Sequence, residues 1–161
     1  MPLRKSLKVI AEVDFLDIKA YAFETSLLDM RNKIFEESKK IKLLLTTTQN
    51  PLLVTSMWDS CIVATAQLDA YFHMLGIFNT IKKEETSAYA VDFLSSWLNI
   101  IKDTNALNIK SLDAISKNVE EAVKGRTIEL IGYFSDTNYR IGKELDKIFL
   151  LKKSIEVKNQ P

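Results

Sequence analysis

The sequence contains one cysteine, Cys61, and one histidine, His73, among its 161 residues. A single cysteine cannot form a disulfide within the chain, and Cys61 is followed by three apolar residues, so we interpret it as a small buried side chain rather than a reactive thiol. A zinc site needs three or four protein ligands, so every ligand beyond these two would have to be a carboxylate. We therefore expect no metal, no cofactor and, because cysteine is so sparse, a reducing cytoplasmic location.

Glycine and proline are also scarce, with four glycines and three prolines, which leaves little material for hairpin turns and favours helices. No Gly-x-Ser-x-Gly motif surrounds a serine, and no glycine-rich loop is available to hold a phosphate. We expect no catalytic residues and predict that the chain is not an enzyme. An enzyme with a site built from scattered carboxylates, which would leave no motif, is a third alternative.

An excess of charge of either sign is missing as well, because 22 Lys and Arg residues face 21 Asp and Glu residues. Nucleic-acid-binding domains usually carry a basic stripe or tail, so we expect no nucleic-acid partner. Glu12 and Asp14 interrupt the apolar residues at the start of the chain before they reach the length of a signal peptide.

The sequence does have one long stretch with few charges, because residues 43–81 carry only Asp59 and Asp69. In the most apolar window of this stretch, residues 60–79, Asp69 lies at the centre, where a charge costs about 3 kcal/mol on insertion scales. We therefore predict no transmembrane segment and interpret the stretch as a helix with apolar side chains on most of its circumference.

Apolar residues repeat at steps of three and four along most of the chain, which is typical of packed helices. They predict a first helix from about residue 13 to 45 and a second from 52 to 82, separated by TTTQNP. A short third helix should begin near residue 87 and end near KDTNALN, residues 102–108. A fourth should begin near Leu112, and Gly125 should either end it or kink it before a last segment that runs to about Ile155.

The pattern predicts an all-α fold: an antiparallel helical bundle of four or five helices, with long first, second and last helices. We expect one domain over residues 1–161, with residues 1–12 as a flexible or extended arm and residues 156–161 as a frayed tail.

The second helix has more apolar surface than a bundle helix needs. Either it runs through the middle of the bundle, or one of its sides packs on another subunit or partner. The leading hypothesis is a non-enzymatic interaction module that forms homo-oligomers or docks on a protein partner through apolar helix faces. Aromatic residues would anchor that interface: Trp58, Tyr71, Phe72, Phe78 and Trp97.

The alternative hypothesis is a bundle that binds or senses a small apolar ligand. Three polar residues of the second helix would then orient the ligand: Gln67, Asp69 and His73. Asp69 and His73 are four residues apart, which also fits a simple ion pair on the helix surface.

Overall fold

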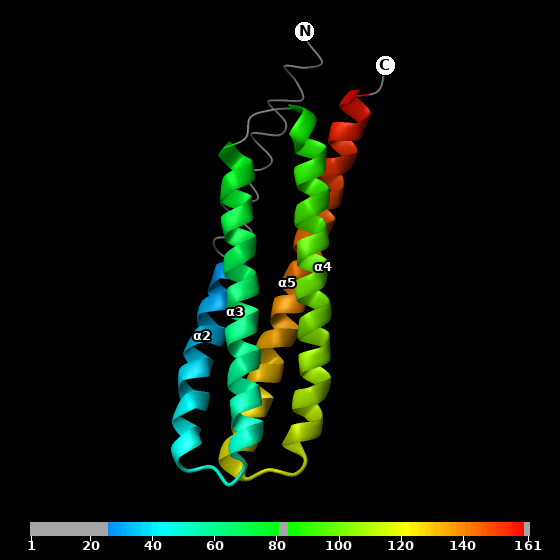
Figure 1. Ribbon diagram of the computed structural model, residues 1–161. Coiled ribbons are helices and arrows are strands. Elements are labelled where there is room, and N and C mark those ends of the chain that lie inside the picture. Colours follow the sequence, from blue (N-terminus) through cyan, green and yellow to red (C-terminus); the bar gives the residue numbers. More distant parts are fainter. Residues whose placement is uncertain (1–25, 81–83, 160–161) are drawn as a thin grey trace.

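A computed structural model of the chain describes residues 26–80 and 84–159, apart from the side chains of residues 78–80, 84–88, 151 and 154–159. The described residues form four α-helices: α2, Leu28–Leu43; α3, Pro51–Thr80; α4, Glu84–Ser116; and α5, Glu121–Asn159. A short 3-10 helix, η2 (Leu44–Thr46), follows α2. The fold is the predicted all-α antiparallel bundle, and its direction alternates from each helix to the next (Figure 1).

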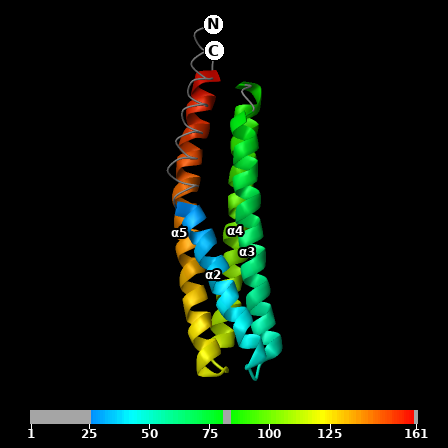
Figure 2. The same ribbon diagram turned by 90° about the vertical axis from the view of Figure 1, so that its left-hand side faces the viewer.

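The four helices occupy the corners of a square. α2 packs on α3 and α5, and α4 packs on the same two helices from the opposite corner. In the second view, α2 begins partway along α5, so the bundle has all four described helices only at the end that carries the two tight loops (Figure 2). α3 therefore lies at a corner and is not surrounded by the other helices.

Two apolar clusters form the core, one after the other along the bundle axis. The cluster at the loop end includes Ile34, Met57, Cys61, Leu130 and Phe134. The second cluster lies toward the other end. Its buried members include Leu68, Tyr71, Leu94, Leu98 and Ile141. Both clusters draw residues spaced three and four apart from several helices, as expected when each helix buries one stripe.

The break between the first two helices is where TTTQNP predicts it. Pro51 is the first residue of α3, where its missing N–H costs no helical hydrogen bond, and the Val54 N–H donates to the Asn50 carbonyl at 3.1 Å. Glu120, the residue before α5, accepts hydrogen bonds from the Thr48 hydroxyl and from the Gln49 N–H, the latter at 3.1 Å. The carboxylate of Glu120 thus joins the two loops at this end of the bundle.

The predicted break at residues 102–108 is wrong, because α4 continues through them to Ser116. The polar groups there bond within the bundle: the Thr104 hydroxyl donates to the Ile100 carbonyl, and the Asn105 side-chain amide donates to Asn138 Oδ1 of α5 at 3.0 Å. The Asn138 amide in turn donates to the Lys102 carbonyl. Thr104 thus bonds within its own helix and the Asn105 amide bonds to α5, while Asn105 Oδ1 is buried without a partner among the described residues.

The separate fourth helix of the prediction is also absent. Its residues divide between the end of α4 and the start of α5, and the chain turns at residues 117–120. Gly125 lies inside α5, within a continuous helix from Glu121 to Asn159, and does not end a helix. The prediction for residues 1–12 lies outside the described residues. The single-domain assignment and the frayed tail at 156–161 stay predictions, although the backbone of α5 is helical to Asn159.

Candidate functional site

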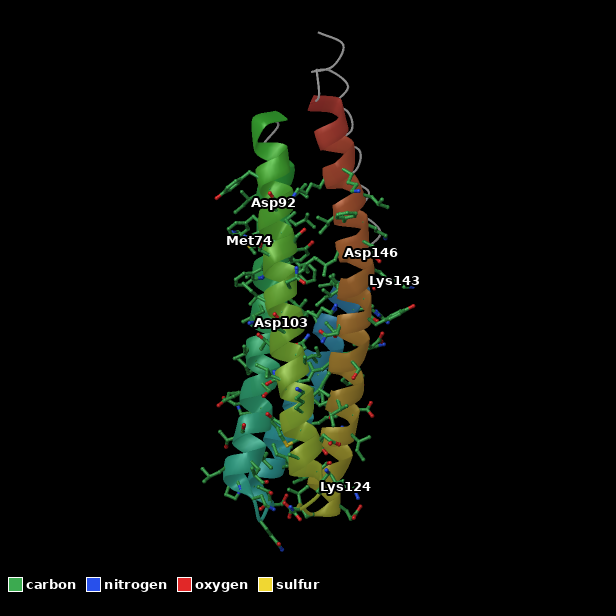
Figure 3. All side chains as sticks on the ribbon, turned by 90° about the vertical axis from the view of Figure 1, so that its right-hand side faces the viewer. Met74, Asp92, Asp103, Lys124, Lys143 and Asp146 are labelled. Atoms are coloured by element: carbon green, nitrogen blue, oxygen red, sulfur yellow. The ribbon has the colours of Figure 1, made fainter. Side chains whose placement is uncertain are left out.

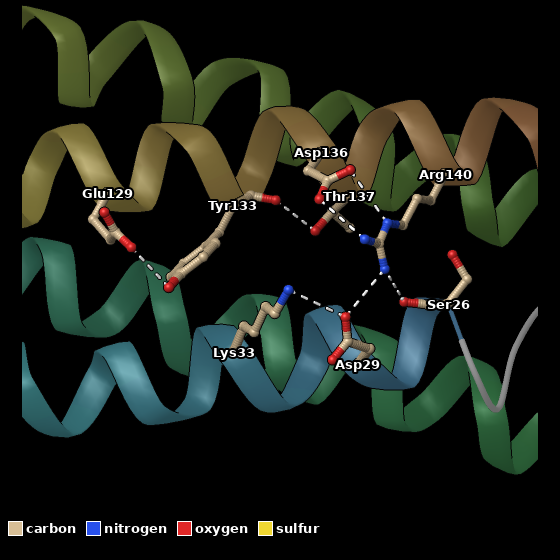
Figure 4. Close-up of polar contacts among 8 residues, drawn as sticks. All are labelled: Ser26, Asp29, Lys33, Glu129, Tyr133, Asp136, Thr137 and Arg140. Atoms are coloured by element: carbon tan, nitrogen blue, oxygen red, sulfur yellow. Dashed lines mark hydrogen bonds and ion pairs between the residues drawn. The ribbon is translucent and has the colours of Figure 1, made fainter.

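Arginine side chains attach α2 to both of its neighbours. Arg31 binds both carboxylate oxygens of Asp69 on α3, at 2.9 and 3.0 Å. Arg140 of α5 donates to both carboxylate oxygens of Asp136, to Asp29 at 3.3 Å and to the Ser26 carbonyl at 2.8 Å (Figure 4). Such two-pronged contacts fix the orientation of the partner as well as its distance.

The Glu37 carboxylate, which is buried in the interface between α2 and α5, makes the third arginine contact. Arg126 binds both of its oxygens, at 2.8 and 3.0 Å. Burial raises the pKa of Glu37, and the Arg126 guanidinium opposes that rise. Nearby, the Tyr133 hydroxyl donates to Glu129 at 2.9 Å, and this hydrogen bond raises the pKa of Tyr133 (Figure 4). The Arg126–Glu37 pair joins α5 to α2, whereas the Tyr133–Glu129 hydrogen bond lies within α5.

Glu144 is a second buried acid, on α5. Its Oε1 atom lies 3.4 Å from Lys147, and its Oε2 atom has no hydrogen-bond partner among the described residues. Burial raises the pKa of Glu144, and burial raises the pKa of Tyr71 on α3, with a smaller contribution from the Glu144 charge. Cys61 is buried too, and burial raises its pKa to about 12, so the thiol is protonated at neutral pH.

Most of the aromatic residues predicted as interface anchors take part in packing within the chain. Tyr71 is fully buried, while Trp58, Phe72 and Trp97 are half-buried against the two core clusters. Lys42 lies over the ring of Trp58, and the indole N–H of Trp97 donates to the Gln67 carbonyl at 3.0 Å. The side chain of Phe78 lies outside the described residues. The role of these residues in an interface stays a prediction.

The three residues predicted to orient a ligand do not converge on one point. Asp69 faces α2, where it pairs with Arg31 rather than with His73. The His73 side chain is exposed. The Gln67 Oε1 atom is buried without a partner among the described residues, and its residue lies two positions, about 200°, around the helix from Asp69. Their role in binding a ligand stays a prediction.

The outer side of α3 and α4 carries exposed apolar side chains near the middle of the bundle. The Trp97 hydrogen bond to Gln67 shows where α3 and α4 meet. Val63 and Ala70 lie one turn on either side of Gln67, and Phe93 and Ile100 lie one turn on either side of Trp97. Val63 is 46% exposed and Ile100 is 48% exposed, so both lie at the edge of this contact and face outward.

On α4 the exposed residues follow at alternating steps of four and three, which places them along one line of the helix. Together with exposed or half-buried residues of α3 they define what we call the α3–α4 face. It comprises Leu52, Ser56, Asp59, Val63, Ala66, Ala70, His73 and Ile77 of α3 and Tyr89, Phe93, Ser96, Ile100, Asp103, Leu107 and Lys110 of α4. Figure 3 shows α4 beside α5, with Asp103 among its side chains.

Charge is distributed unequally between this face and the rest of the molecule. Two of the thirty residues of α3 are charged, Asp59 and Asp69, whereas eight of the sixteen residues of α2 are charged. α5 carries charged side chains along its whole length, among them Lys124, Lys143 and Asp146 (Figure 3). α3 is therefore the helix with the fewest charges, although large apolar side chains are also exposed on α5, for example Ile128 and Tyr139.

The sequence contained a signal for this face that the prediction missed. The seam of Ala90, Leu94, Trp97 and Ile101 identified the buried side of α4, and a second seam runs beside it from Tyr89 to Lys110. Because the third helix was expected to end near residue 102, the second seam was cut off after its first half. With the helix continuous to Ser116, both seams can be followed.

No helix among the described residues is long and apolar enough to cross a membrane. Within the same residues, no three His, Cys, Asp or Glu side chains are grouped to hold a metal ion. Comparison with protein-family models, with curated proteins and with solved structures finds no match for this chain. Its function must therefore be argued from its own residues.

Proposed function

We propose that this chain is a non-enzymatic interaction module that docks on a protein partner through the α3–α4 face. One observation carries the proposal: the exposed residues of this face are mostly apolar on both helices, and only three of them, Asp59, Asp103 and Lys110, are Asp, Glu, Lys or Arg. Single exposed apolar residues are ordinary on a protein surface, but contiguous apolar patches mark interaction sites. A cytoplasmic location belongs to the same proposal, supported by the scarcity of cysteine, since Cys61 is the single one and is buried.

A protein partner suits this face better than a nucleic acid does. Nucleic-acid recognition depends on Lys and Arg side chains that neutralise phosphates, and α3 has neither residue. On α4, Lys102 and Lys110 are accompanied by Asp103 and Asp113. A face of this composition gains binding energy mainly by removing apolar surface from water.

A site-specific photo-crosslinker tests the proposal. We would place the crosslinker at Ala66, which is exposed on the α3–α4 face, and at Ala122, an exposed alanine of α5, as the matched control. We expect a discrete protein adduct from position 66 alone, and we expect Ile100→Asp in the same chain to abolish it. Equal labelling from both positions, or no adduct from position 66, would contradict the proposal.

A further inference from the structure

We infer that the partner of the α3–α4 face is a second copy of this chain, packed antiparallel about a two-fold axis that passes beside Ile100. This inference rests on the proposed function and names the partner. In such a dimer α4 lies over α4 of the other copy and α3 lies over α3, because a two-fold axis in the interface plane and perpendicular to the helices reverses their direction.

The residues of α4 match one another across this axis. When Ile100 meets its own copy, a residue that follows Ile100 in one helix faces the residue that precedes Ile100 by the same number of positions in the other helix. Leu107 then faces Phe93, because both are seven positions from Ile100. Asp103 lies beside Ser96 and Lys110 lies beside Tyr89, because the distances of the two residues from Ile100 differ by one position in each pair. Apolar side chains meet apolar ones, and each charged side chain meets a hydroxyl group.

Asp103 and Lys110 are available for this pairing, because each is exposed and neither forms an ion pair with another described residue. In the antiparallel register, the Ser96 hydroxyl can donate to Asp103 of the other copy, and the Tyr89 hydroxyl can accept from its Lys110. The polar residues of the α4 half of the face are thus placed to satisfy one another, while Asp59 of α3 lies beside Ala66 of the other copy.

The size of the face also fits a dimer. The thirty residues of α3 extend about 45 Å, at about 1.5 Å per residue. Two helices whose axes lie 8–10 Å apart present a side about 20 Å wide, so the face has an area on the order of 900 Å². Stable interfaces of standard size bury about 800 Å² on each partner.

The level of the apolar residues places the axis near the middle of this area. Trp97 of α4 is level with Gln67 of α3, because the two are hydrogen-bonded. The helices are antiparallel, so Ile100, one turn after Trp97, is level with Val63, one turn before Gln67. Ala66 lies beside them. Residues at the centre of an interface contribute most of the binding energy, so Ile100 is the position at which a charge should do most harm.

The first experiment measures mass by light scattering after size exclusion, over a range of concentrations. We expect the wild-type chain to have twice the 18.4 kDa mass of one copy. Ile100→Asp should weaken the dimer at least about 100-fold, because the two new carboxylates would face each other at the axis. Ile128→Asp, at an isoleucine of α5 that is 58% exposed, is the matched control and should leave the dimer intact.

A charge exchange tests the register without disturbing the apolar centre. Ser96→Asp should weaken the dimer at least tenfold, because two carboxylates would then meet across the axis, and Ser96→Lys should tighten it by pairing with Asp103. The double variant Ser96→Asp/Asp103→Lys should restore dimerisation. Circular dichroism on each variant separates loss of the dimer from loss of the fold.

The outcomes separate the dimer from the proposed function. A wild-type monomer at every concentration overturns the inference, as does a dimer that survives both Ile100→Asp and Ser96→Asp. If the chain is a monomer but the crosslinker at Ala66 captures a different protein, the proposed function stands and the second copy is excluded as the partner. If the crosslinker captures nothing and the chain is a monomer, both fail.

Discussion

At the scale of single residues, the buried acids determine how stability depends on pH. The raised pKa of Glu144 means that the folded chain holds its proton to a higher pH than the unfolded chain does. Its contribution to the free energy of unfolding is therefore greatest at acid pH and decreases as pH rises from the ordinary glutamate pKa through the raised one. At pH values above the raised pKa, Glu144 is ionised in both states, and burial of its carboxylate lowers the free energy of unfolding by its full amount.

Replacing the acid removes this cost. We expect Glu144→Gln to raise the free energy of unfolding at neutral pH by about 1 kcal/mol, because an amide is cheaper to bury than a carboxylate. The gain should vanish at acid pH, where Glu144 is protonated. Urea unfolding at several pH values measures the difference, with the exposed Asp146→Asn as control. A gain that does not change with pH would show that the carboxylate is not the cause.

Cys61 gives a second test at this scale. Because its thiol is buried and its pKa is about 12, we expect iodoacetamide to label it at least about 100-fold more slowly than an exposed cysteine at pH 8. The control is Cys61→Ala/Ala122→Cys, which moves the thiol to an exposed position of α5. Denaturant should bring the two rates together. Fast labelling of the native chain would contradict the packing of Cys61 in the core.

At the scale of helices, the pattern of apolar residues was enough to predict the type of each element and most of the fold. α3 was predicted at 52–82 and spans Pro51–Thr80, because a proline and a run of threonines mark its start. The end of α4 could not be predicted in the same way. Asn105 is a common residue at a helix end, and what keeps it inside α4 is Asn138, 33 residues further along the chain. A contact of this kind is invisible to local propensity.

The site was harder to predict than the fold for a related reason. Aromatic residues are the usual anchors of an interface, but Tyr71 is used in the core, and the exposed strip consists mainly of aliphatic residues such as Val63 and Ile100. Periodicity shows that a helix has apolar sides. Which of those sides the neighbouring helices cover depends on the arrangement of all four.

The continuity of α4 makes a direct prediction. Ala106 is exposed in the middle of the segment that resembles a loop, so a substitution there acts mainly on the backbone. We expect Ala106→Pro to lower the free energy of unfolding by about 3 kcal/mol and Ala106→Gly by about 1 kcal/mol, the usual costs within a helix. Thermal or denaturant unfolding measures both. If residues 102–108 formed a loop, the proline would be tolerated.

At the scale of the whole molecule, the bundle separates two kinds of contact. Ion pairs of Arg31, Arg126 and Arg140 bind α2 to its neighbours, whereas the described contact of α3 with α4 is mainly apolar. Charged residues are most frequent on α2 and α5 and least frequent on α3, whereas exposed large apolar side chains occur on α3 and α4 and also on α5.

If the α3–α4 face joins two copies, folding and association are linked, and thermal stability must depend on concentration. For a dimer that unfolds to two separate chains, a tenfold rise in concentration adds about 1.4 kcal/mol per mole of dimer. Dividing this added free energy by the entropy of unfolding of two chains of this length gives a rise in Tm of about 2 °C. We expect scanning calorimetry to show this rise for the wild-type chain and for Ile128→Asp. The Ile100→Asp variant should have the same Tm at all concentrations, because a monomer has no association equilibrium that concentration could shift.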